Sequence, residues 1–234
     1  MSRPTAENSN TPRRVPLTKD RVLRTAVGLA DGAGIEAVSM RRLAAELGVV
    51  PMALYKHVES KEELLDGMVD LVFEDIEDPT GDTDWKAAMC RRAISTRQAL
   101  KRHGWAIGRM ESRTNPGPAN LRHHNAVMGC LREAGFSFDM AVHAYSVLDS
   151  YIYGFALQEQ TLPFQTPGEH IEVLEKKAQT IGDLTPYPYL IEAAANITQS
   201  GYDYADEFEW GLELILEGLE WVRTPEGRAI RRRA

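Results

Sequence analysis

The sequence predicts an all-α fold in two parts: a small N-terminal unit of short helices and a larger C-terminal helical bundle. Apolar residues recur at helical spacing between residues that start or stop helices, and no alternating strand of useful length occurs. The charges divide in the same way. Overall, 27 Lys and Arg stand against 34 Asp and Glu, yet residues 1–58 carry a net charge of +4 and residues 59–234 carry −11. This division indicates that the two parts meet different partners.

The bulk composition is that of an ordinary globular chain, 43% hydrophobic and 26% charged. No apolar run approaches the roughly 18 residues that a membrane span requires. Residues 1–16 are polar and do not resemble a signal peptide, so we expect a cytoplasmic protein. Cys90 and Cys130 lie in apolar helical surroundings, which favours buried free thiols over a disulfide or a metal pair.

Two helices are predicted in the first 48 residues. The Thr18 side chain can cap the first, whose apolar spacing ends at the glycines of 32–34. Ser39 can cap the second, which ends at Gly48.

Two more helices follow a tight turn at Gly48. Pro51 suits the first position of a third helix over 51–57, because it needs no N–H there. Ser60 can cap a fourth, with Glu62 and Glu63 in its first turn.

The segment 77–85 (EDPTGDTDW) interrupts this pattern, and a series of longer helices follows it. They are expected at about 84–103, 117–134, 137–160, 170–180, 187–199 and 203–223. The chain thus divides into an arm (1–16), a small helical domain (17–65), a large helical domain (66–224) and a basic tail (225–234).

Three short helices with a glycine turn between the second and third have helix-turn-helix architecture, in which the third helix enters the DNA major groove. Helical spacing alone fits a plain bundle equally well. The specific signal lies in residues 39–68, SMRRLAAELGVVPMALYKHVESKEELLDGM, which closely resemble the DNA-binding domain of the tetracycline-repressor (TetR) family. LYKHV at 54–58 and SKEELL at 60–65 are its most specific marks, and residues 135–160 and 208–222 resemble the regulatory domain of the same family.

The resemblance implies a transcriptional regulator, most simply a repressor, that binds double-stranded DNA at a palindromic operator as a homodimer and leaves it when a small organic effector binds. A transcriptional activator is one alternative. An α-helical metal-binding enzyme with a vestigial helix-turn-helix is another, but the sequence contains no nucleophile elbow, HExxH or phosphate loop. We therefore predict no enzyme activity, no cofactor and no metal.

The candidate DNA contacts lie on the second, third and fourth helices. Arg41 can offer its planar fork to guanine, while Met52 and Ala53 suit thymine methyl groups or shape fitting. The resemblance directs Tyr55 and His57 toward phosphates. The full set is Arg41, Pro51, Met52, Ala53, Tyr55, Lys56, His57 and Lys61.

Other residues of the same region have different expected roles. Five are expected to pack the small core without touching DNA: Leu43, Ala44, Leu47, Leu54 and Val58. The arginines of the arm, Arg3, Arg13 and Arg14, either reach a minor groove or only solubilise the chain. Arg228 and Arg231–Arg233 are expected to be a solvated tail.

The expected dimer interface pairs the last long helix with the 137–160 helix, as a four-helix interface between two chains. The same apolar stripes also fit packing within one chain. The candidate residues are Leu148, Ile152, Phe155, Phe208, Gly211, Leu212, Ile215, Gly218, Leu219 and Val222, with Ala141 on the matching stripe.

Polar and aromatic residues of the middle helices are candidates for an effector pocket, although each also fits ordinary core or surface. They are Arg92, Thr96, Trp105, Met110, Asn115, His124, Met128, Asp149, Tyr153 and Gln158. The tetracycline repressors hold a magnesium-chelated drug through a histidine, and the aligned position here is Glu111. The supporting positions fall near Ser150 and Gln158, so another small organic ligand is expected. Adjacent His123 and His124 point to different sides of a helix and are not expected to hold a metal together.

Overall fold

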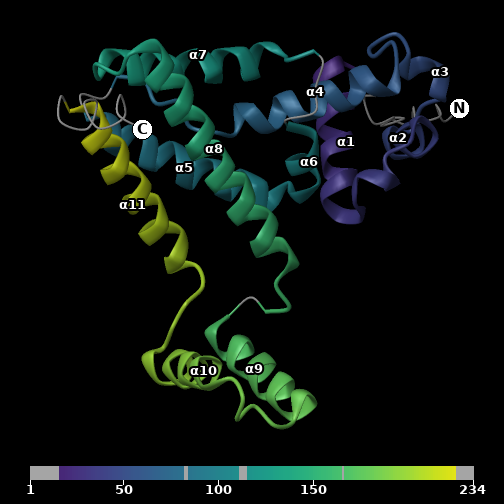
Figure 1. Ribbon diagram of the computed structural model, residues 1–234. Helices are drawn as coiled ribbons and strands as arrows, with labels where there is room; N and C mark the ends of the chain where they lie inside the picture. Colours follow the sequence, from purple (N-terminus) through teal and green to yellow (C-terminus); the bar gives the residue numbers. More distant parts are fainter. Residues whose placement is uncertain (1–15, 82–83, 111–114, 165, 225–234) are drawn as a thin grey trace, which may run out of the picture. The chain divides into compact units, whose positions relative to one another are not determined.

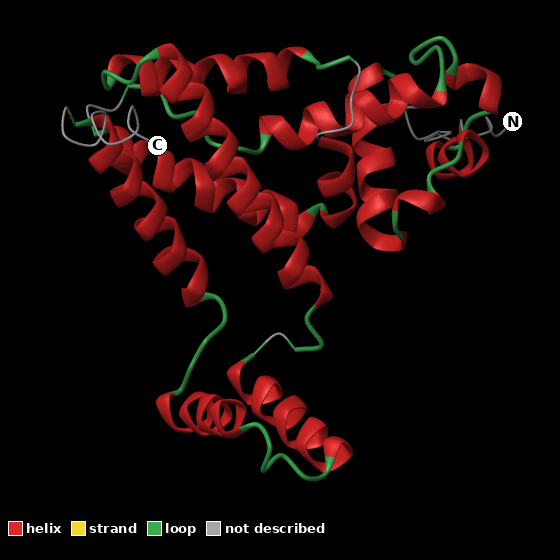
Figure 2. Cartoon of the chain, viewed as in Figure 1, coloured by secondary structure: helices red, strands yellow, loops and turns green. Residues whose placement is uncertain are grey.

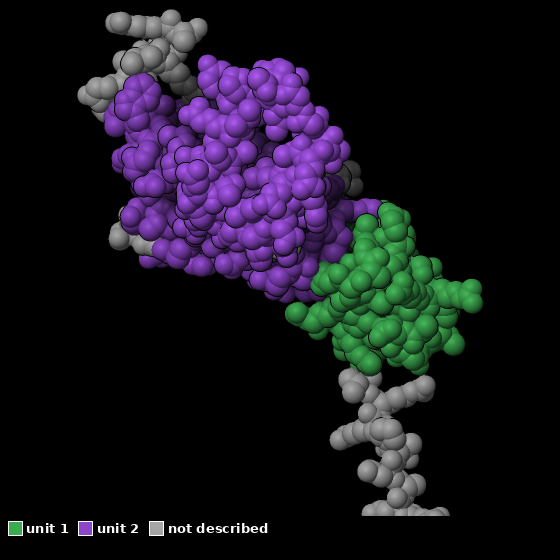
Figure 3. Space-filling view, turned by 90° about the horizontal axis from the view of Figure 1, so that it is seen from below, with its two compact units in different colours: residues 1–68 green, residues 69–234 purple. Residues whose placement is uncertain are grey.

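The computed structural model describes residues 16–81, 84–110, 115–164 and 166–224, and the regular structure of these residues is entirely helical (Figures 1 and 2). The predicted all-α class is confirmed. The chain forms two compact units, residues 1–68 and 69–234, which Figure 3 colours separately. None of the described helices is long and apolar enough to cross a membrane.

Unit 1 contains the predicted helix-turn-helix. Its elements are α1 (Lys19–Ala33), the short 3-10 helix η1 (Ile35–Ala37), α2 (Met40–Leu47), α3 (Pro51–Leu54) and the start of α4 (Lys61–Glu74). Helix α4 is continuous across the boundary at 68/69, so it starts in unit 1 and ends in unit 2. The boundary predicted from the sequence, between residues 65 and 66, also lies within this helix.

The predicted helix caps of unit 1 are present. The Thr18 hydroxyl accepts a hydrogen bond from the Arg21 N–H at 3.2 Å, and the Ser39 hydroxyl accepts one from the Arg42 N–H at the same distance. Gly48 ends α2 in the left-handed conformation, at φ 66°, where glycine avoids the strain of a side chain.

The predicted core of unit 1 is confirmed. All five of its residues are buried, and Leu43 and Leu54 are completely enclosed. The third helix is shorter than predicted: α3 ends at Leu54, and residues 55–57 continue as a hydrogen-bonded turn. The sequence did not reveal η1, because three residues are too few to show a helical period.

Unit 2 contains the rest of α4 and seven α-helices. These are α5 (Trp85–Arg102), α6 (Ile107–Met110), α7 (Pro118–Glu133), α8 (Phe138–Thr161), α9 (Pro167–Ile181), α10 (Pro188–Ser200) and α11 (Asp206–Arg223), with a 3-10 helix η2 (Gly104–Ala106) before α6. The six predicted helices are all present. Helix α9 begins three residues early because Thr166 caps it and Pro167 takes its first position, while η2 and α6 were predicted as loop.

Two apolar clusters form the interior of unit 2. The larger one joins α5, α7, α8 and α11, and Figure 1 shows α8 crossing α5. The smaller one joins the end of α4 to α5, α6 and α8. Helices α9 and α10 contact each other, but neither contains a buried residue.

Candidate nucleic-acid interface and interior polar site

The helix-turn-helix of unit 1 exposes apolar side chains at its turn and on α3. Met52 is 72% exposed and Val50 67% exposed, although both are large hydrophobic residues. Tyr55 is also exposed, one residue beyond α3. Because exposed apolar groups of this size normally mark a contact surface, the turn and α3 are candidates for contact with a partner. Val50 was not predicted from the sequence, since a valine in a turn gives no specific signal.

The predicted DNA-contact residues lie on α2, on α3 and the turn after it, and at the start of α4. Arg41 is exposed on the first turn of α2, Lys56 is exposed in the turn after α3, and Lys61 is exposed at the start of α4. Pro51 is exposed, whereas Ala53 and His57 are partly buried. We call Arg41, Val50, Met52, Tyr55 and Lys56 the reading surface.

A polar link joins the start of α1 to the start of α4. Lys19 on α1 donates to Glu63 on α4 at 2.6 Å, and the other Glu63 carboxylate oxygen accepts the Glu59 N–H at 2.5 Å. The Lys19 hydrogen bond holds the pKa of Glu63 below its ordinary value. The predicted Ser60 cap is present, since its hydroxyl accepts the Glu63 N–H at 3.0 Å.

A second group of polar residues lies in the interior of unit 2. Arg92 on α5 donates through Nη2 to Asp149 Oδ1 on α8 at 2.5 Å, and through Nε to His123 Nε2 on α7 at 3.0 Å. The other ring nitrogen of His123, Nδ1, lies 2.9 Å from Asp78 Oδ1. Arg92 and His123 are each 1% exposed and Asp149 is 5% exposed. These four residues, Arg92, His123, Asp149 and Asp78, are called the Arg92 cluster.

The cluster fixes the protonation of its histidine. Because a guanidinium can only donate, His123 Nε2 must accept from Arg92, so the proton is on Nδ1 and is donated to Asp78. Burial, followed by the charge of Arg92, lowers the pKa of His123 to about 4. The ring is therefore neutral near pH 7.

Two polar atoms of the cluster make no hydrogen bond within the described residues. Among the described residues, Arg92 Nη1 and Asp149 Oδ2 are buried and have no hydrogen-bond partner. A buried polar group without a partner costs about 1–3 kcal/mol, and more when it is charged. The pair thus has one donor atom and one acceptor atom whose hydrogen-bonding capacity is unused.

Aromatic rings lie beside the Arg92 cluster. The Arg92 guanidinium lies 5.8 Å from the Tyr145 ring centroid, and the Tyr145 hydroxyl is 3.0 Å from His124 Nδ1. Burial and the nearby Asp149 carboxylate raise the pKa of Tyr145, so its hydroxyl stays protonated. Phe73 packs beside His123 with ring centroids 5.7 Å apart.

The structure brings together only part of the predicted pocket set. Arg92 and Asp149 are paired, and Thr96 is buried one turn from Arg92. His124 contacts the hydroxyl of Tyr145, whose ring lies beside Arg92. Trp105, Met110, Met128 and Tyr153 lie in or against the two apolar clusters, whereas Asn115 and Gln158 are exposed.

Three residues of the interior site were missed by the sequence-based prediction: His123, Tyr145 and Asp78. His123 was considered only as a metal ligand. Among the described residues, no group of three His, Cys, Asp or Glu side chains could hold a metal ion. Glu111, the arm arginines Arg3, Arg13 and Arg14, and the tail arginines Arg228 and Arg231–Arg233 lie outside the described residues.

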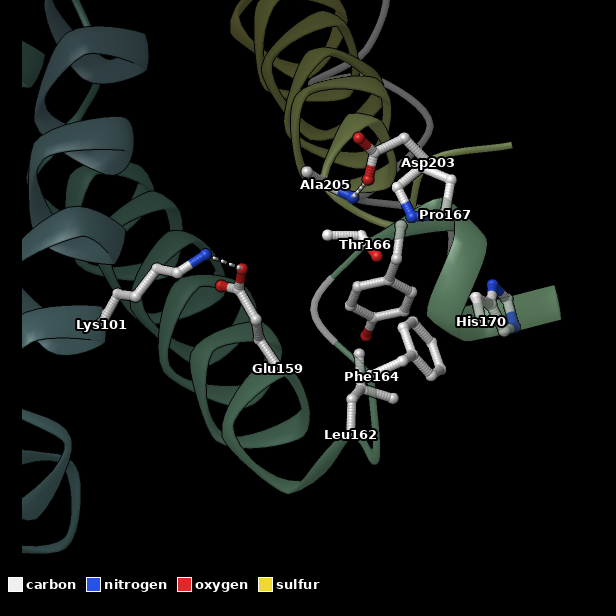
Figure 4. Close-up of a pocket in the computed structure, with 10 residues that line it drawn as sticks. Lys101, Glu159, Leu162, Phe164, Thr166, Pro167, His170, Asp203 and Ala205 are labelled. Atoms are coloured by element: carbon white, nitrogen blue, oxygen red, sulfur yellow. Dashed lines mark hydrogen bonds and ion pairs between the residues drawn. The ribbon is translucent and has the colours of Figure 1, made fainter. Parts of the chain in front are cut away.

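A separate small cavity of about 80 Å³ lies where α8 ends and α9 begins (Figure 4). Lys101 and Glu159 form an ion pair at 3.2 Å on one side, and Phe164 stacks on His170 with ring centroids 4.0 Å apart on the other. Burial alone would raise the pKa of Glu159, but its hydrogen bonds to Arg97 and Lys101 outweigh burial and lower it. The cavity is large enough for a few water molecules and not for a drug-sized ligand.

The predicted dimer stripe lies mostly in the core of a single chain. Seven of its residues are buried within the single chain: Ala141, Leu148, Ile152, Phe155, Phe208, Leu212 and Leu219. Ile215 and Val222 are partly buried against the same core. Gly211 serves close packing within the chain, since a Cβ at this position would stand 2.3 Å from the Tyr151 hydroxyl on α8.

The opposite face of α11 is exposed and apolar. Trp210, Leu214 and Trp221 are 65%, 61% and 50% exposed, and their spacing places them on one side of the helix. Gly218 is exposed beside this side, and a Cβ there would meet no atom of the chain. On α8, Val147 and Leu157 are also exposed. The sequence pattern did not separate this face from the core face, because both are apolar.

Comparison with known proteins defines the class. Residues 22–68 match the family "Bacterial regulatory proteins, tetR family", and residues 78–223 match "Tetracyclin repressor-like, C-terminal domain". The chain belongs to the TetR family of transcriptional regulators. It is a ligand-responsive DNA-binding repressor and not an enzyme, and the enzyme and activator alternatives are set aside.

Individual relatives agree with this assignment. The chain is 36% identical to the HTH-type transcriptional repressor DrrR1 of Streptomyces coeruleorubidus, over 87% of this chain and 77% of the relative. It is 30% identical to the class C tetracycline repressor protein of Escherichia coli, over 88% and 92% of the two chains. Among solved structures, ActR of Streptomyces coelicolor in complex with actinorhodin is similar, with a TM-score of 0.72, 31% identity and coverage of 88% and 97%.

Proposed function

We propose that the chain represses transcription as a homodimer on a palindromic operator and leaves the operator when a small organic effector binds around Arg92 and Asp149. The observation that carries the proposal is the reading surface, which exposes large apolar side chains on a helix-turn-helix. A single helix-turn-helix makes few base contacts, and two copies related by a two-fold axis double them. Its site of action would be the cytoplasm.

On the operator, each part of the reading surface has a distinct role. Arg41 donates to guanine O6 and N7, while Val50 and Met52 contact thymine methyl groups. Tyr55 and Lys56 contact phosphates, which fix the position of the protein without reading sequence. His57 and Lys61, outside the reading surface, contact phosphates as well. The operator half-site would therefore contain a guanine near a thymine-rich step.

The dimer uses the exposed face of α11 with the exposed part of α8. Trp210, Leu214 and Trp221 supply apolar area, and Gly218 allows the backbones of two chains to approach closely. Burial of such a face is the main favourable term in homodimer association.

The effector site is centred on the Arg92–Asp149 pair. The effector would be a flat aromatic molecule with a hydrogen-bond acceptor for Arg92 Nη1 and a donor for Asp149 Oδ2. ActR, solved with actinorhodin, supports a small organic ligand in this class of protein. An effector can release the operator only if it binds the DNA-free state more tightly than the DNA-bound state.

Selection from random duplex DNA tests this function directly. We expect the full-length protein to recover palindromic sites, to prefer them over scrambled duplexes at every salt concentration, and to migrate as a dimer. Binding without sequence preference at all salt concentrations would overturn the proposal. For the effector, hydroxyl-bearing aromatic ketones should release the operator, whereas their O-methyl ethers, which lack the donor, should not.

A further inference from the structure

The Arg92 cluster forms a continuous polar path between three helices of unit 2 and the segment that follows α4. The path runs from Asp149 on α8 to Arg92 on α5, then to His123 on α7, and ends at Asp78. Its three contacts measure 2.5, 3.0 and 2.9 Å. Arg92 and His123 thus join Asp149 to Asp78.

The path has a fixed direction. Arg92 can only donate and Asp78, as a carboxylate, can only accept, so His123 must accept on Nε2 and donate on Nδ1. The buried ring has no second arrangement that satisfies both neighbours. When the Arg92 guanidinium shifts, the ring either follows it and disturbs Asp78, or loses the Arg92 bond.

Further carboxylates hold the segment 70–78 against α5 and α7. Asp70, on the last turns of α4, accepts the N–H groups of Ala119 and Asn120 at 3.2 and 3.0 Å. This contact requires Gly117, since a Cβ there would stand 2.2 Å from the Asp70 carboxylate. The segment is thus anchored to the first turns of α7.

The far end of the segment is held by α5. Glu77 accepts from Arg91 Nε at 3.1 Å, and its N–H donates to the Ser95 hydroxyl at 2.9 Å. Asp75 accepts from Arg102 at 3.2 Å. Because α4 is one helix from Lys61 to Glu74, the position of this segment sets the position of the end of α4.

We infer that His123 is a positioning residue that couples the Arg92–Asp149 pair to the segment 70–78. The inference rests on the proposed effector site at that pair. An effector that takes a hydrogen bond from Arg92 moves the guanidinium, and His123 passes the shift to Asp78 and to the end of α4. His123 itself does not touch DNA and need not touch the effector.

Hydrogen exchange tests this coupling without DNA and without an effector. Four full-length proteins are compared: the wild type, Asp149→Asn, His123→Asn and the variant with both substitutions. Hydrogen exchange is measured in peptides that cover residues 69–80. With His123 intact, we expect Asp149→Asn to speed exchange there by about five-fold. The shorter side chain of His123→Asn has no atom at the position of Nε2 to accept from Arg92, so in that background the same substitution should change exchange by less than about two-fold.

A matched control comes from a second ion pair between α5 and α8. Glu159→Gln breaks the Arg97–Glu159 pair, whose two contacts are both 2.9 Å, without touching the Arg92 cluster. Its effect on residues 69–80 should be the same in both backgrounds. If His123→Asn does not fold, Asp78→Ala replaces it as the background, since the Asp78 side chain is 24% exposed and lies at the end of the path.

Two results would overturn the coupling. One is an equal effect of Asp149→Asn in both backgrounds, which is what a purely structural His123 would give. The other is no change of exchange in 69–80 upon Asp149→Asn with His123 intact. Either result leaves the repressor function standing, whereas failure of the wild type to select an operator would contradict the proposed function and not this measurement.

Discussion

The reading surface of unit 1 and the Arg92 cluster of unit 2 use charged side chains in opposite ways. Arg41 and Lys56 are exposed, so each stays hydrated until a partner arrives. Arg92, His123 and Asp149 are buried, so each depends on its neighbours. A substitution on the surface should therefore remove one contact with the partner. A substitution in the cluster should disturb the whole interior.

The largest expected effect is the loss of one partner from the buried pair. Arg92→Leu leaves Asp149 buried without its counter-charge, and we expect the free energy of unfolding to fall by about 3–5 kcal/mol. Urea unfolding at one fixed protein concentration measures it. Arg92→Leu combined with Asp149→Leu should recover most of the loss.

The exposed pair Arg24–Asp20, with a contact of 2.8 Å, is the matched control. Arg24→Leu should cost less than about 1 kcal/mol. Equal losses for Arg92→Leu and Arg24→Leu would contradict the proposed contrast between interior and surface.

The next largest effect concerns the proposed dimer face. Leu214→Arg places a charge in the centre of the exposed side of α11, so we expect monomers and an operator affinity at least about 100-fold lower. Light scattering and fluorescence anisotropy measure the two quantities. Leu121→Arg, at a leucine of α7 that is 56% exposed, should leave both unchanged. A Leu214→Arg protein that remains a dimer would place the interface elsewhere.

On the reading surface, Arg41→Ala should weaken operator binding by about 1–3 kcal/mol. The loss should concentrate at one base pair of each half-site, because a bidentate arginine reads one guanine. Binding to a set of single-base operator variants measures this pattern. A uniform loss across all variants would make Arg41 a phosphate contact instead.

A smaller effect comes from the titration of His123. Its folded pKa of about 4 lies below its ordinary value of 6.5, so the unfolded chain takes up a proton first as the pH falls. The contribution of the neutral His123 ring to the free energy of unfolding is complete above pH 6.5 and is lost as the pH falls from 6.5 to 4. The free energy of unfolding changes there by at most about 1.4 kcal/mol per pH unit per chain. Urea unfolding between pH 7 and 5 should show a shallower slope for His123→Asn. Identical slopes would show that His123 is not held neutral by the fold.

The smallest change is expected for Lys56→Ala. Loss of one phosphate contact should weaken all sequences alike and reduce the salt slope of log K by about 0.9 per contact. Anisotropy titrations from low to high salt measure the slope. A sequence-dependent loss would assign Lys56 to base contact.

The sequence predicted those features that depend on local chemistry. The caps at Thr18, Ser39 and Ser60 and the glycine stop at Gly48 determine the helices of unit 1, and each is a signal within four residues. The core residues of unit 1 were predicted from helical spacing, which is also a pattern of residues three or four positions apart. The family resemblance added the functional class.

Features that depend on contacts between distant residues were not predictable in this way. Arg92 and Asp149 are 57 positions apart, and His123 and Asp78 are 45 apart, so one sequence gives no sign that they meet. On α11, Leu212 and Leu214 are both leucines on an apolar helix, yet one is buried and the other is exposed. The packing of α8 and α5 against one side of α11 buries Leu212 and leaves Leu214 exposed.

The most direct test of the regulated repressor is one titration of a labelled palindromic duplex, recovered by selection, with and without a compound that binds the protein. We expect nanomolar-range specific binding that the compound weakens by about 5–150-fold, and by linkage the duplex should weaken the compound equally. A compound that binds at the Arg92–Asp149 pair and leaves the operator affinity unchanged would contradict the coupling of the two regions.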